Sequence, residues 1–452
     1  MPGRSRCAVV GAGSRARLYV GAMTGEHADV AELVAVCDVN PGRARLHADR
    51  AAAAGAPAPT CHHPDDLERM IAERGVDRVV VTSPDVTHAD VAARALRAGA
   101  DVVVEKPLTI DEAGCRTVAT AVAETGREVV VTFNYRYAPR NAALRELVAS
   151  GAVGDVTSVH FEWLLDTRHG ADYFRRWHRD KASSGGLLVH KASHHFDLVN
   201  WWIDDAPTRV YARGGLRFYG AENARRRGVA HGRRDDPAAA QDPFALDLRA
   251  DPELRELYLD HEGHDGYLRD QDVFGEGITI EDTLSLVVDH ARGSTMTYSL
   301  TAHAPWEGYV VAVNGTRGRA ELTVVERGAV AAGDVLDASA AGAGDRGAGL
   351  RPVSERLLLQ QHWQPAREVA IPADAGAHGG GDARLLRDVF RGPGEDPLRR
   401  AADHVDGLRS LAVGIAGNAS LASGLPVDTA DLDLGLPVRG ARAGSGRPGP
   451  RD

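Results

Sequence analysis

Lysine is the residue type whose placement points most directly to chemistry. It occurs at three positions, Lys106, Lys181 and Lys191, and arginine supplies the rest of the 53 basic side chains. A buried ammonium group can shift its pKa and pass a proton, whereas a guanidinium group stays charged. Lys106 follows an apolar run and precedes Pro107, at the place where a strand is expected to end. We therefore predict that Lys106 takes part in proton transfer.

Two histidines form a second candidate group, after the glycine pair of residues 185–186. A helix is predicted here, and His190, His194 and Asp197 share one of its faces because they lie four and then three residues apart. Imidazole titrates near neutral pH, so His190 or His194 can act as a general base, and the spacing does not decide between them. Zinc binding and a structural role in the core are the alternatives. We expect no metal, because the cluster offers no further obvious ligand.

The first predicted strand ends in a glycine-rich turn, Gly11-Ala-Gly-Ser-Arg-Ala16, which opens a helix. Gly11 permits the tight turn, and Gly13 lets the backbone approach a pyrophosphate. The next predicted strand ends at Asp38, where a ribose 2′-hydroxyl requires an acceptor. A strand before the turn, a helix after it and this acid together predict a dinucleotide site.

The residues around this site bear on which dinucleotide binds there. Asp38 favours NAD, because a carboxylate repels the additional 2′-phosphate of NADP. Arg15, Arg17 and Arg43 lie near the site in the sequence, and arginine attracts the same phosphate. We expect NAD, while NADP stays open.

Two later strand ends border the predicted site. Residues 82–88 and residues 105–107 both follow valine-rich strands, and a proline stops each strand. Ligands of an open parallel sheet bind beyond the carboxyl ends of its strands, so both segments are expected beside the nicotinamide. The predicted cofactor contacts are Gly11, Gly13, Ser14, Arg15, Asp38, Ser83, Pro84, His88, Glu105 and Lys106.

The elements that position these residues alternate short apolar runs with helical patterns. Continuous rather than alternating apolarity is typical of parallel strands that helices cover on both faces. The first domain is predicted to span residues 1–133. Its strands are expected at residues 7–11, 33–37, 60–61, 78–82, 101–105 and 128–133.

A second domain is predicted over residues 134–436. Residues 217–280 interrupt it with arginine clusters and acids, which we interpret as an inserted arm or lid. Residues 437–452 have the composition of a disordered tail. Half-buried strands are expected at residues 156–163, 209–214, 283–289, 294–301 and 309–314.

Four residues near the junction of the two domains are predicted to contact a substrate. They are Tyr135, Arg136, Trp177 and Lys191. Arg136 can bind a polar substrate group or tie the domains together by a salt bridge. Trp177 offers an aromatic face that suits a sugar ring, although such residues more often serve packing. Lys191 points away from the helix face of His190 and can reach a substrate from an adjacent face.

These motifs resemble the glucose-fructose oxidoreductase, inositol dehydrogenase and rhizopine-catabolism family (Gfo/Idh/MocA). The similarity rests on residues 9–14, 83–88, 98–107 with their Glu-Lys-Pro ending, 133–136 and 184–197. It implies an α/β chain with an N-terminal Rossmann domain and a C-terminal α+β domain built on a large, mostly antiparallel open sheet. In the family the positions matching His190 and His194 are usually Asp and His, and the latter takes the substrate proton, so His190 is a departure. The resemblance also implies a homodimer or homotetramer.

The composition limits the partners of the chain. A formal net charge of −10 provides no basic field to attract nucleic acid or an anionic membrane, so a small-molecule ligand is expected. The four cysteines show no paired spacing, which indicates reduced thiols. The N-terminus lacks an apolar signal core, and no apolar stretch of about 18 residues exists. We expect a cytoplasmic protein.

Together these observations predict an NAD(P)-dependent oxidoreductase. The substrate would be a hydroxyl or ketone of a sugar, cyclitol or glycoside, with Lys106 and His194, assisted or replaced by His190, moving the proton. The alternative is an NAD-dependent glycoside hydrolase that oxidises its substrate transiently and then eliminates. A non-catalytic sugar sensor is a third reading, which loss of the lysine or the histidines would favour.

Overall fold

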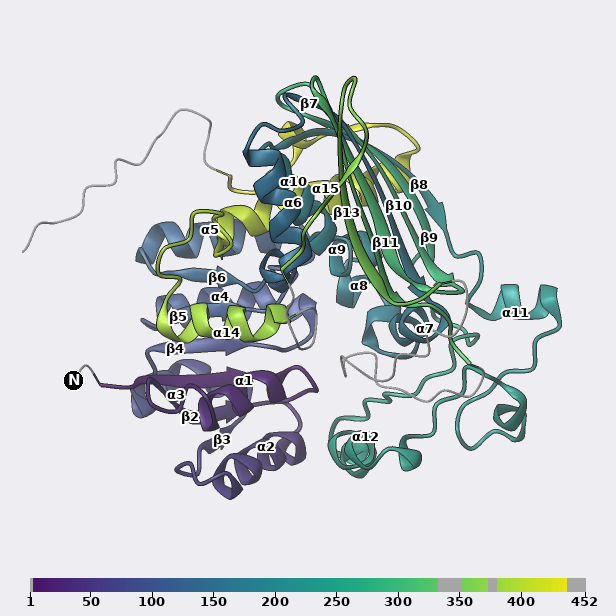
Figure 1. Cartoon of the computed structure of the whole chain (residues 1–452). Coiled ribbons are helices and arrows are strands. Elements are labelled where there is room, and N and C mark those ends of the chain that lie inside the picture. The colour runs from purple at the N-terminus through teal and green to yellow at the C-terminus, as the bar shows by residue number, and fades with distance from the viewer. Residues whose placement is uncertain (1–2, 332–350, 373–379, 437–452) are drawn as a thin grey trace, which may run out of the picture.

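The computed structural model describes residues 3–331, 351–372 and 380–436, which form two domains (Figure 1). The first domain, which carries the N-terminus, occupies the lower left of the view, and the tall sheet of the second domain stands at the upper right. The tail predicted at residues 437–452 lies outside the described residues.

The first domain is built on a seven-stranded sheet in the order β15-β6-β5-β4-β1-β2-β3. Only the short edge strand β15 is antiparallel to its neighbour among the described strands of this sheet. The six strands predicted for this domain are confirmed, with shifts of no more than two residues at their ends. The strands are β1 (Ser5–Val10), β2 (Ala31–Cys37), β3 (Thr60–His62), β4 (Arg78–Val81), β5 (Asp101–Val104), β6 (Val129–Val131) and β15 (Ala402–Asp403).

Helices cover both faces of this sheet, which explains the unbroken apolar runs of its strands. One apolar core lies between the sheet and the helices α3 (Leu67–Arg74), α4 (His88–Arg97), α5 (Glu112–Thr125) and α15 (His404–Ser423). A second core lies on the opposite face, under α1 (Ala16–Thr24), α2 (Pro41–Ala53) and α14 (Gly381–Arg391).

The strand order of the first domain reverses at β1, which pairs with β2 on one side and β4 on the other. A crevice opens at such a reversal, beyond the carboxyl ends of the strands. The glycine turn after β1 and the loops after β4 and β5 therefore meet at one edge of the sheet. The topology thus brings three of the predicted cofactor segments together.

The second domain is built on a nine-stranded sheet in the order β14-β13-β12-β11-β7-β10-β9-β8-β16. It is mostly antiparallel, as the resemblance implies, and β7 pairs with β10 in parallel. The five predicted strands are present, whereas β12, β13, β14 and β16 lie outside the prediction. The strands are β7 (Val156–Asp166), β8 (Pro207–Gly215), β9 (Thr283–His290), β10 (Thr295–Ala304), β11 (Glu307–Gly315), β12 (Gly318–Arg327), β13 (Ser354–Gln361), β14 (Arg367–Val369) and β16 (Val427–Asp428).

Helices pack on one face of the second sheet, on the side of the first domain (Figure 1). On the other face the alternate residues of β9, Ser285, Val287 and Asp289, are exposed. Among the described residues, the second sheet is therefore uncovered on this side. The helices of this domain are α6 (Pro139–Ala149), α7 (Thr167–Arg175), α8 (Lys181–Ser184), α9 (Leu187–His190) and α10 (Ser193–Ile203).

The inserted arm, residues 217–280, connects β8 to β9 through α11 (Ala221–Arg227), α12 (Pro252–Leu257) and α13 (Glu262–Asp265). A small apolar cluster around Leu254, Leu257 and Tyr258 packs against Leu46 of α2. Figure 1 accordingly shows α12 beside α2, so the arm reaches from the second domain to the first. Within the part of the chain that the structure describes, no helix is long and apolar enough to cross a membrane.

Candidate active site

A cavity of about 740 Å³ opens between the two domains, within the range of about 300–1,000 Å³ that small-molecule sites span. Its walls come from both domains and from the inserted arm. Of the residues predicted from the sequence to form a site, only Arg136 does not line it. The predicted residues that line it are Gly11, Gly13, Ser14, Arg15, Asp38, Ser83, Pro84, His88, Glu105, Lys106, Tyr135, Trp177, His190, Lys191 and His194.

The glycine turn and the acid after β2 have the features that NAD binding requires. Gly11 has a φ of 97°, and a Cβ atom there would lie 2.3 Å from the backbone N of Ser83, so no side chain fits. Asp38 lies beside the turn, because its carboxylate accepts a hydrogen bond of 2.5 Å from the backbone N of Ala12. A turn at which no side chain obstructs the backbone and a carboxylate that suits the ribose thus border one cavity. The residues present fit NAD.

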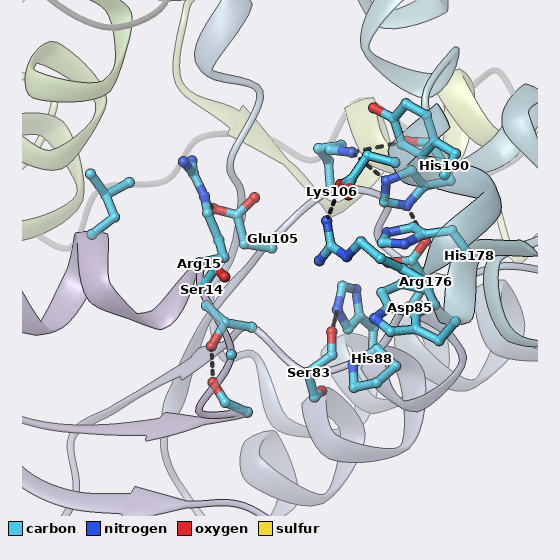
Figure 2. Close-up of a pocket in the computed structure, with 18 of the residues that line it drawn as sticks. Ser14, Arg15, Ser83, Asp85, His88, Glu105, Lys106, Arg176, His178 and His190 are labelled. Atoms are coloured by element: carbon cyan, nitrogen blue, oxygen red, sulfur yellow. Dashed lines mark hydrogen bonds and ion pairs between the residues drawn. The ribbon is translucent and has the colours of Figure 1, made fainter. Parts of the chain in front are cut away.

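Lys106 stands at the loop after β5 and points toward the second domain (Figure 2). Its Nζ lies 3.3 Å from Nε2 of His190 and donates a hydrogen bond of 3.1 Å to the carbonyl oxygen of His190. Burial lowers the pKa of Lys106 to about 8, with Asp85 opposing the shift and Lys191 adding to it. An amine with this pKa can hold or release a proton near neutral pH.

His190 connects Lys106 to a buried carboxylate, Asp85, that comes from the loop after β4. His190 Nδ1 lies 2.5 Å from Asp85 Oδ2. A protonated Lys106 can only donate, so Nε2 of His190 accepts and the ring proton is assigned to Nδ1, facing Asp85. Burial lowers the pKa of His190 well below its ordinary value and raises that of Asp85, so the pair shares one proton. Lys106, His190 and Asp85 thus form one hydrogen-bonded chain across the domain junction.

The single helix predicted to carry both histidines is wrong, because the structure has two helices there, α9 and α10. The backbone N of Ala192 donates to the carbonyl oxygen of Leu187, five residues earlier. This wider turn shifts the phase of α10 relative to α9, so the two histidines do not share a helix face. His194 stacks on Tyr135 with ring centroids 4.4 Å apart. Both imidazoles line the cavity, and the His190 ring contacts Lys106.

Aromatic side chains form the wall of the cavity opposite the glycine turn. The His178 ring meets His190 edge-on with centroids 4.2 Å apart, and Trp177 stacks on His178 at 3.7 Å. Further along the wall, His169 Nε2 lies 3.1 Å from the Tyr173 hydroxyl. The wall therefore combines ring faces with groups that can donate and accept hydrogen bonds.

His88, predicted as a cofactor contact, has both ring nitrogens close to backbone carbonyl oxygens. Nδ1 lies 2.7 Å from Pro107 O, and Nε2 lies 2.9 Å from Ser83 O. The ring therefore holds the loops after β4 and β5 together and borders the cavity without a nitrogen directed at a ligand.

The two remaining lysines have different surroundings. Lys191 is buried, donates a hydrogen bond of 3.2 Å to the Tyr135 hydroxyl, and lies 4.8 Å from the Trp163 ring centroid. It borders the cavity from behind Tyr135. Lys181 forms an ion pair with Glu281 and is not among the lining residues.

The prediction that Arg136 binds substrate is contradicted by its place in the structure. Arg136 makes a bidentate pair with Asp197, with distances of 2.8 Å and 2.6 Å, and reaches Asp406 at 3.3 Å. The Arg136 and Asp197 side chains are 3% and 2% exposed, so a substrate has no access to them. The alternative considered for Arg136, a salt bridge, is the correct one. Asp406 lies in the first turn of α15, so the bridge fixes that helix.

Replacing Arg136 with methionine is expected to destabilise the protein without weakening substrate binding. Removing one partner of a buried ion pair costs about 3–5 kcal/mol, because the other charge stays buried and unpaired. Thermal or denaturant unfolding should therefore begin earlier, while KM stays within about twofold, since the side chain lies outside the cavity. If the unfolding of the variant is unchanged and its KM is raised, Arg136 would instead be assigned a role in substrate binding.

Several residues that line the cavity were not predicted as site residues from the sequence. Asp85 lies within residues 82–88, which were predicted to border the cofactor, and an acid in that loop was the available signal. Tyr258, Asp265 and Tyr267 of the inserted arm also line the cavity. No local pattern in the sequence places them there, because long-range packing of the arm brings them to the first domain. Among the described residues, no group of three or more histidine, cysteine, aspartate or glutamate side chains is arranged to hold a metal ion.

The relatives found by comparison with known proteins include oxidoreductases and inositol dehydrogenases. YteT of Bacillus subtilis (strain 168), an oxidoreductase by name, is 33% identical over 387 residues, which cover 81% of this chain and 85% of that protein. The inositol 2-dehydrogenase of Rhizobium meliloti (strain 1021) is 31% identical over 211 residues. That second match covers 47% of this chain and 58% of the relative, so it spans only about half of each protein.

Solved structures share the fold at low sequence identity. Levoglucosan dehydrogenase in complex with NADH has a TM-score of 0.64 and 16% identity, and the match covers 94% of this chain and 99% of that one. The aldose-aldose oxidoreductase of Caulobacter crescentus has a TM-score of 0.61 and 17% identity, over 94% and 100% of the two chains. At sequence identities this low, the similarity shows only that the fold is shared.

Family descriptions cover nearly all of the described chain. Residues 5–133 match the oxidoreductase family with an NAD-binding Rossmann fold, and residues 145–429 match the C-terminal alpha/beta domain of the same family. The geometry of the crevice, the extent of the YteT match and these two domains agree. The chain belongs to the Gfo/Idh/MocA oxidoreductase family, and its first domain is an NAD-binding Rossmann domain.

Proposed function

We propose that the protein is an NAD-dependent oxidoreductase that interconverts a hydroxyl and a ketone on a sugar, cyclitol or glycoside. The observation that carries this proposal is the hydrogen-bonded chain of Lys106, His190 and Asp85 beside the glycine turn and Asp38. When bound, NAD supplies the redox step by exchanging a hydride at its nicotinamide ring. The residues of the chain bind the reactants, orient them and move the proton.

The proton path starts at Lys106. Because the pKa of Lys106 is lowered to about 8, part of the amine is neutral near pH 7 and can accept the proton of a substrate hydroxyl. His190 Nε2, 3.3 Å away, can take that proton onward. Asp85 faces the other ring nitrogen and stabilises the positive charge that His190 then carries. In the reverse direction the Lys106 ammonium donates the proton to the ketone oxygen.

The wall of the cavity supports a ring-shaped, polyhydroxylated substrate. Trp177 and His178 present aromatic surface, which suits the apolar face of a sugar ring. Tyr173, His169 and Arg176 line the same cavity and offer hydrogen-bonding groups for hydroxyls. Relatives named inositol 2-dehydrogenase and levoglucosan dehydrogenase act, by their names, on a cyclitol and on an anhydrosugar, which supports the same substrate class here.

A second candidate is a glycoside hydrolase that oxidises and re-reduces its substrate on one retained NAD. The inserted arm favours it, because the Tyr258 hydroxyl lies 2.9 Å from the backbone N of Ser14 and 2.8 Å from Ser14 Oγ, over the glycine turn. An arm in this position would have to move before a cofactor bound at the turn could leave. A hydrolase of this type consumes no NAD overall, whereas a dehydrogenase does.

One assay separates these two functions. The purified protein is mixed with NAD and a panel of sugars, cyclitols and aryl glycosides, and reduced cofactor and released aglycone are both followed by absorbance. We expect net formation of reduced cofactor with at least one free sugar or cyclitol. Aglycone release without net reduction would establish the hydrolase instead, and the absence of both with every substrate would refute the proposed substrate class.

We also propose that the protein works in the cytoplasm as a homodimer or homotetramer. The open face of the second sheet supports assembly, because it exposes Tyr211 and Val287, which are 37% and 43% exposed in the single chain. The unpaired cysteines Cys7, Cys37, Cys61 and Cys115 support a reducing compartment.

A further inference from the structure

Opposite charges meet at the ribose end of the cofactor site, on the first domain. Asp38 follows β2, and Arg43 lies on α2, with Arg43 Nη2 at 3.3 Å from Asp38 Oδ1. In Rossmann domains a carboxylate here binds the ribose hydroxyls of NAD, whereas a nearby arginine accommodates the 2′-phosphate of NADP. The first domain contains both groups, so its own residues do not decide between the two cofactors.

The inserted arm adds a second carboxylate at this point. Asp265, at the end of α13, forms an ion pair with the same Nη2 of Arg43. The Arg43, Asp38 and Asp265 side chains are 8%, 9% and 14% exposed, so water screens these charges poorly. Two carboxylates and one guanidinium leave the cluster with a net charge of −1.

The other arginines near the turn are also paired with acids. Arg15, which lies beside Glu105 in Figure 2, has its Nε 2.6 Å from Glu105 Oε1. Arg17 forms an ion pair with Glu253 of the inserted arm. Each of the three arginines that could attract the 2′-phosphate of NADP therefore has a carboxylate partner. The inserted arm supplies a carboxylate to both Arg17 and Arg43.

Several contacts fix the arm against α2 and so fix the position of Asp265. Asn40 Nδ2 donates a hydrogen bond of 2.9 Å to the carbonyl oxygen of His261. The His261 ring sits so close to Gly42 that a Cβ atom there would lie 2.3 Å from Nδ1. The Tyr267 backbone N donates to Asp265 Oδ1 at 3.2 Å, which orients the carboxylate.

We propose that Asp265 is a specificity-determining residue that makes the enzyme select NAD over NADP. Asp265 pairs with Arg43 from the inserted arm. Together with Asp38 it leaves a net negative charge where the 2′-phosphate of NADP would bind, and water screens this charge poorly. Juxtaposed like charges cost several kcal/mol in binding, whereas the neutral ribose hydroxyls of NAD meet no such penalty. This inference rests on the proposed use of NAD, and it assigns the choice of cofactor to the inserted arm.

The test compares the Asp265→Asn variant with wild type and with Asp260→Asn. Asp260 lies on the same arm and pairs with Arg255 on an exposed surface, so its replacement is the matched control. Dissociation constants for NADH and NADPH are measured by quenching of tryptophan fluorescence, without substrate, because Trp177 lines the cavity. Wild type and Asp260→Asn should bind NADH at least about a hundredfold more tightly than NADPH. Asp265→Asn should tighten NADPH binding at least about tenfold and change NADH binding by less than about threefold.

A double variant, Asp265→Asn with Arg43→Leu, should lose the gain in NADPH affinity, because the freed guanidinium provides it. Equal tightening or weakening of both cofactors in Asp265→Asn would overturn the proposal, as would a wild-type protein that binds NADPH as tightly as NADH. Since no turnover is involved, failure of this inference is distinguishable from failure of the proposed reaction.

Discussion

Replacing Lys106 with methionine is expected to lower turnover at least about a hundredfold, the low end for a positioned acid–base group. Methionine keeps much of the side-chain volume but cannot carry a proton, so binding of NADH should stay within about threefold of wild type. Turnover is measured under saturating substrate, and NADH affinity by fluorescence. The matched control is Lys181→Met, which removes a lysine that lies outside the cavity and pairs with Glu281. Lys181→Met should retain turnover within about twofold.

The pH profile of the reaction gives Lys106 a second signature. Because burial lowers the pKa of Lys106 to about 8, the amine is mostly protonated below that pH, and the protonated form cannot accept a proton. Oxidation of the alcohol should therefore fall as pH falls through about 8, and reduction of the ketone should fall as pH rises through the same value. The residual activity of Lys106→Met should lack this break. A break that persists unchanged in the variant would assign it to another group.

Replacing His190 with phenylalanine is expected to lower turnover about a hundredfold, within the range of about 10²–10⁴ for acid–base groups. Phenylalanine keeps a ring edge-on to His178 but removes both the acceptor for Lys106 and the donor to Asp85. The loss should appear mainly in kcat, because the ring that borders the cavity is retained.

His194→Phe is the comparison that separates the two imidazoles. His194 stacks on Tyr135, and a phenyl ring can stack in the same place. We expect His194→Phe to reduce turnover at least about tenfold less than His190→Phe does. A severe loss in His194→Phe beside near-normal turnover in His190→Phe would transfer the role of proton acceptor to His194.

The first domain was predictable because its structure is encoded locally. Strands such as β4 and β5 are unbroken valine runs, and the turn at Gly11 admits no side chain, so composition and spacing carry the fold. In the second domain β12 has the same alternation as the predicted strands, with Ala320, Leu322 and Val324 buried. Its other face carries the charged residues Arg319 and Glu321, so the strand begins without a continuous apolar run.

The features of the site that could not be predicted from the sequence depend on backbone geometry or on contacts between residues far apart in the chain. The phase shift between α9 and α10 arises from one wide backbone turn at Ala192, which has no residue signature. Asp265 meets Arg43 across 222 positions of sequence, and Asp85 meets His190 across 105. The role of Arg136 could not be decided from the sequence, because an arginine suits both a substrate-binding site and an interdomain salt bridge. Its partners Asp197 and Asp406 decide the matter.

The most direct measurement is a crystal structure of the protein with NAD and a sugar or cyclitol that the assay shows to react. We expect the reacting oxygen within about 3.2 Å of Lys106 Nζ, the reach of a hydrogen bond, with His190 still between Lys106 and Asp85. A substrate whose reacting oxygen lies beyond reach of Lys106, or an ammonium group that has turned to bulk water, would refute the role of Lys106 in proton transfer.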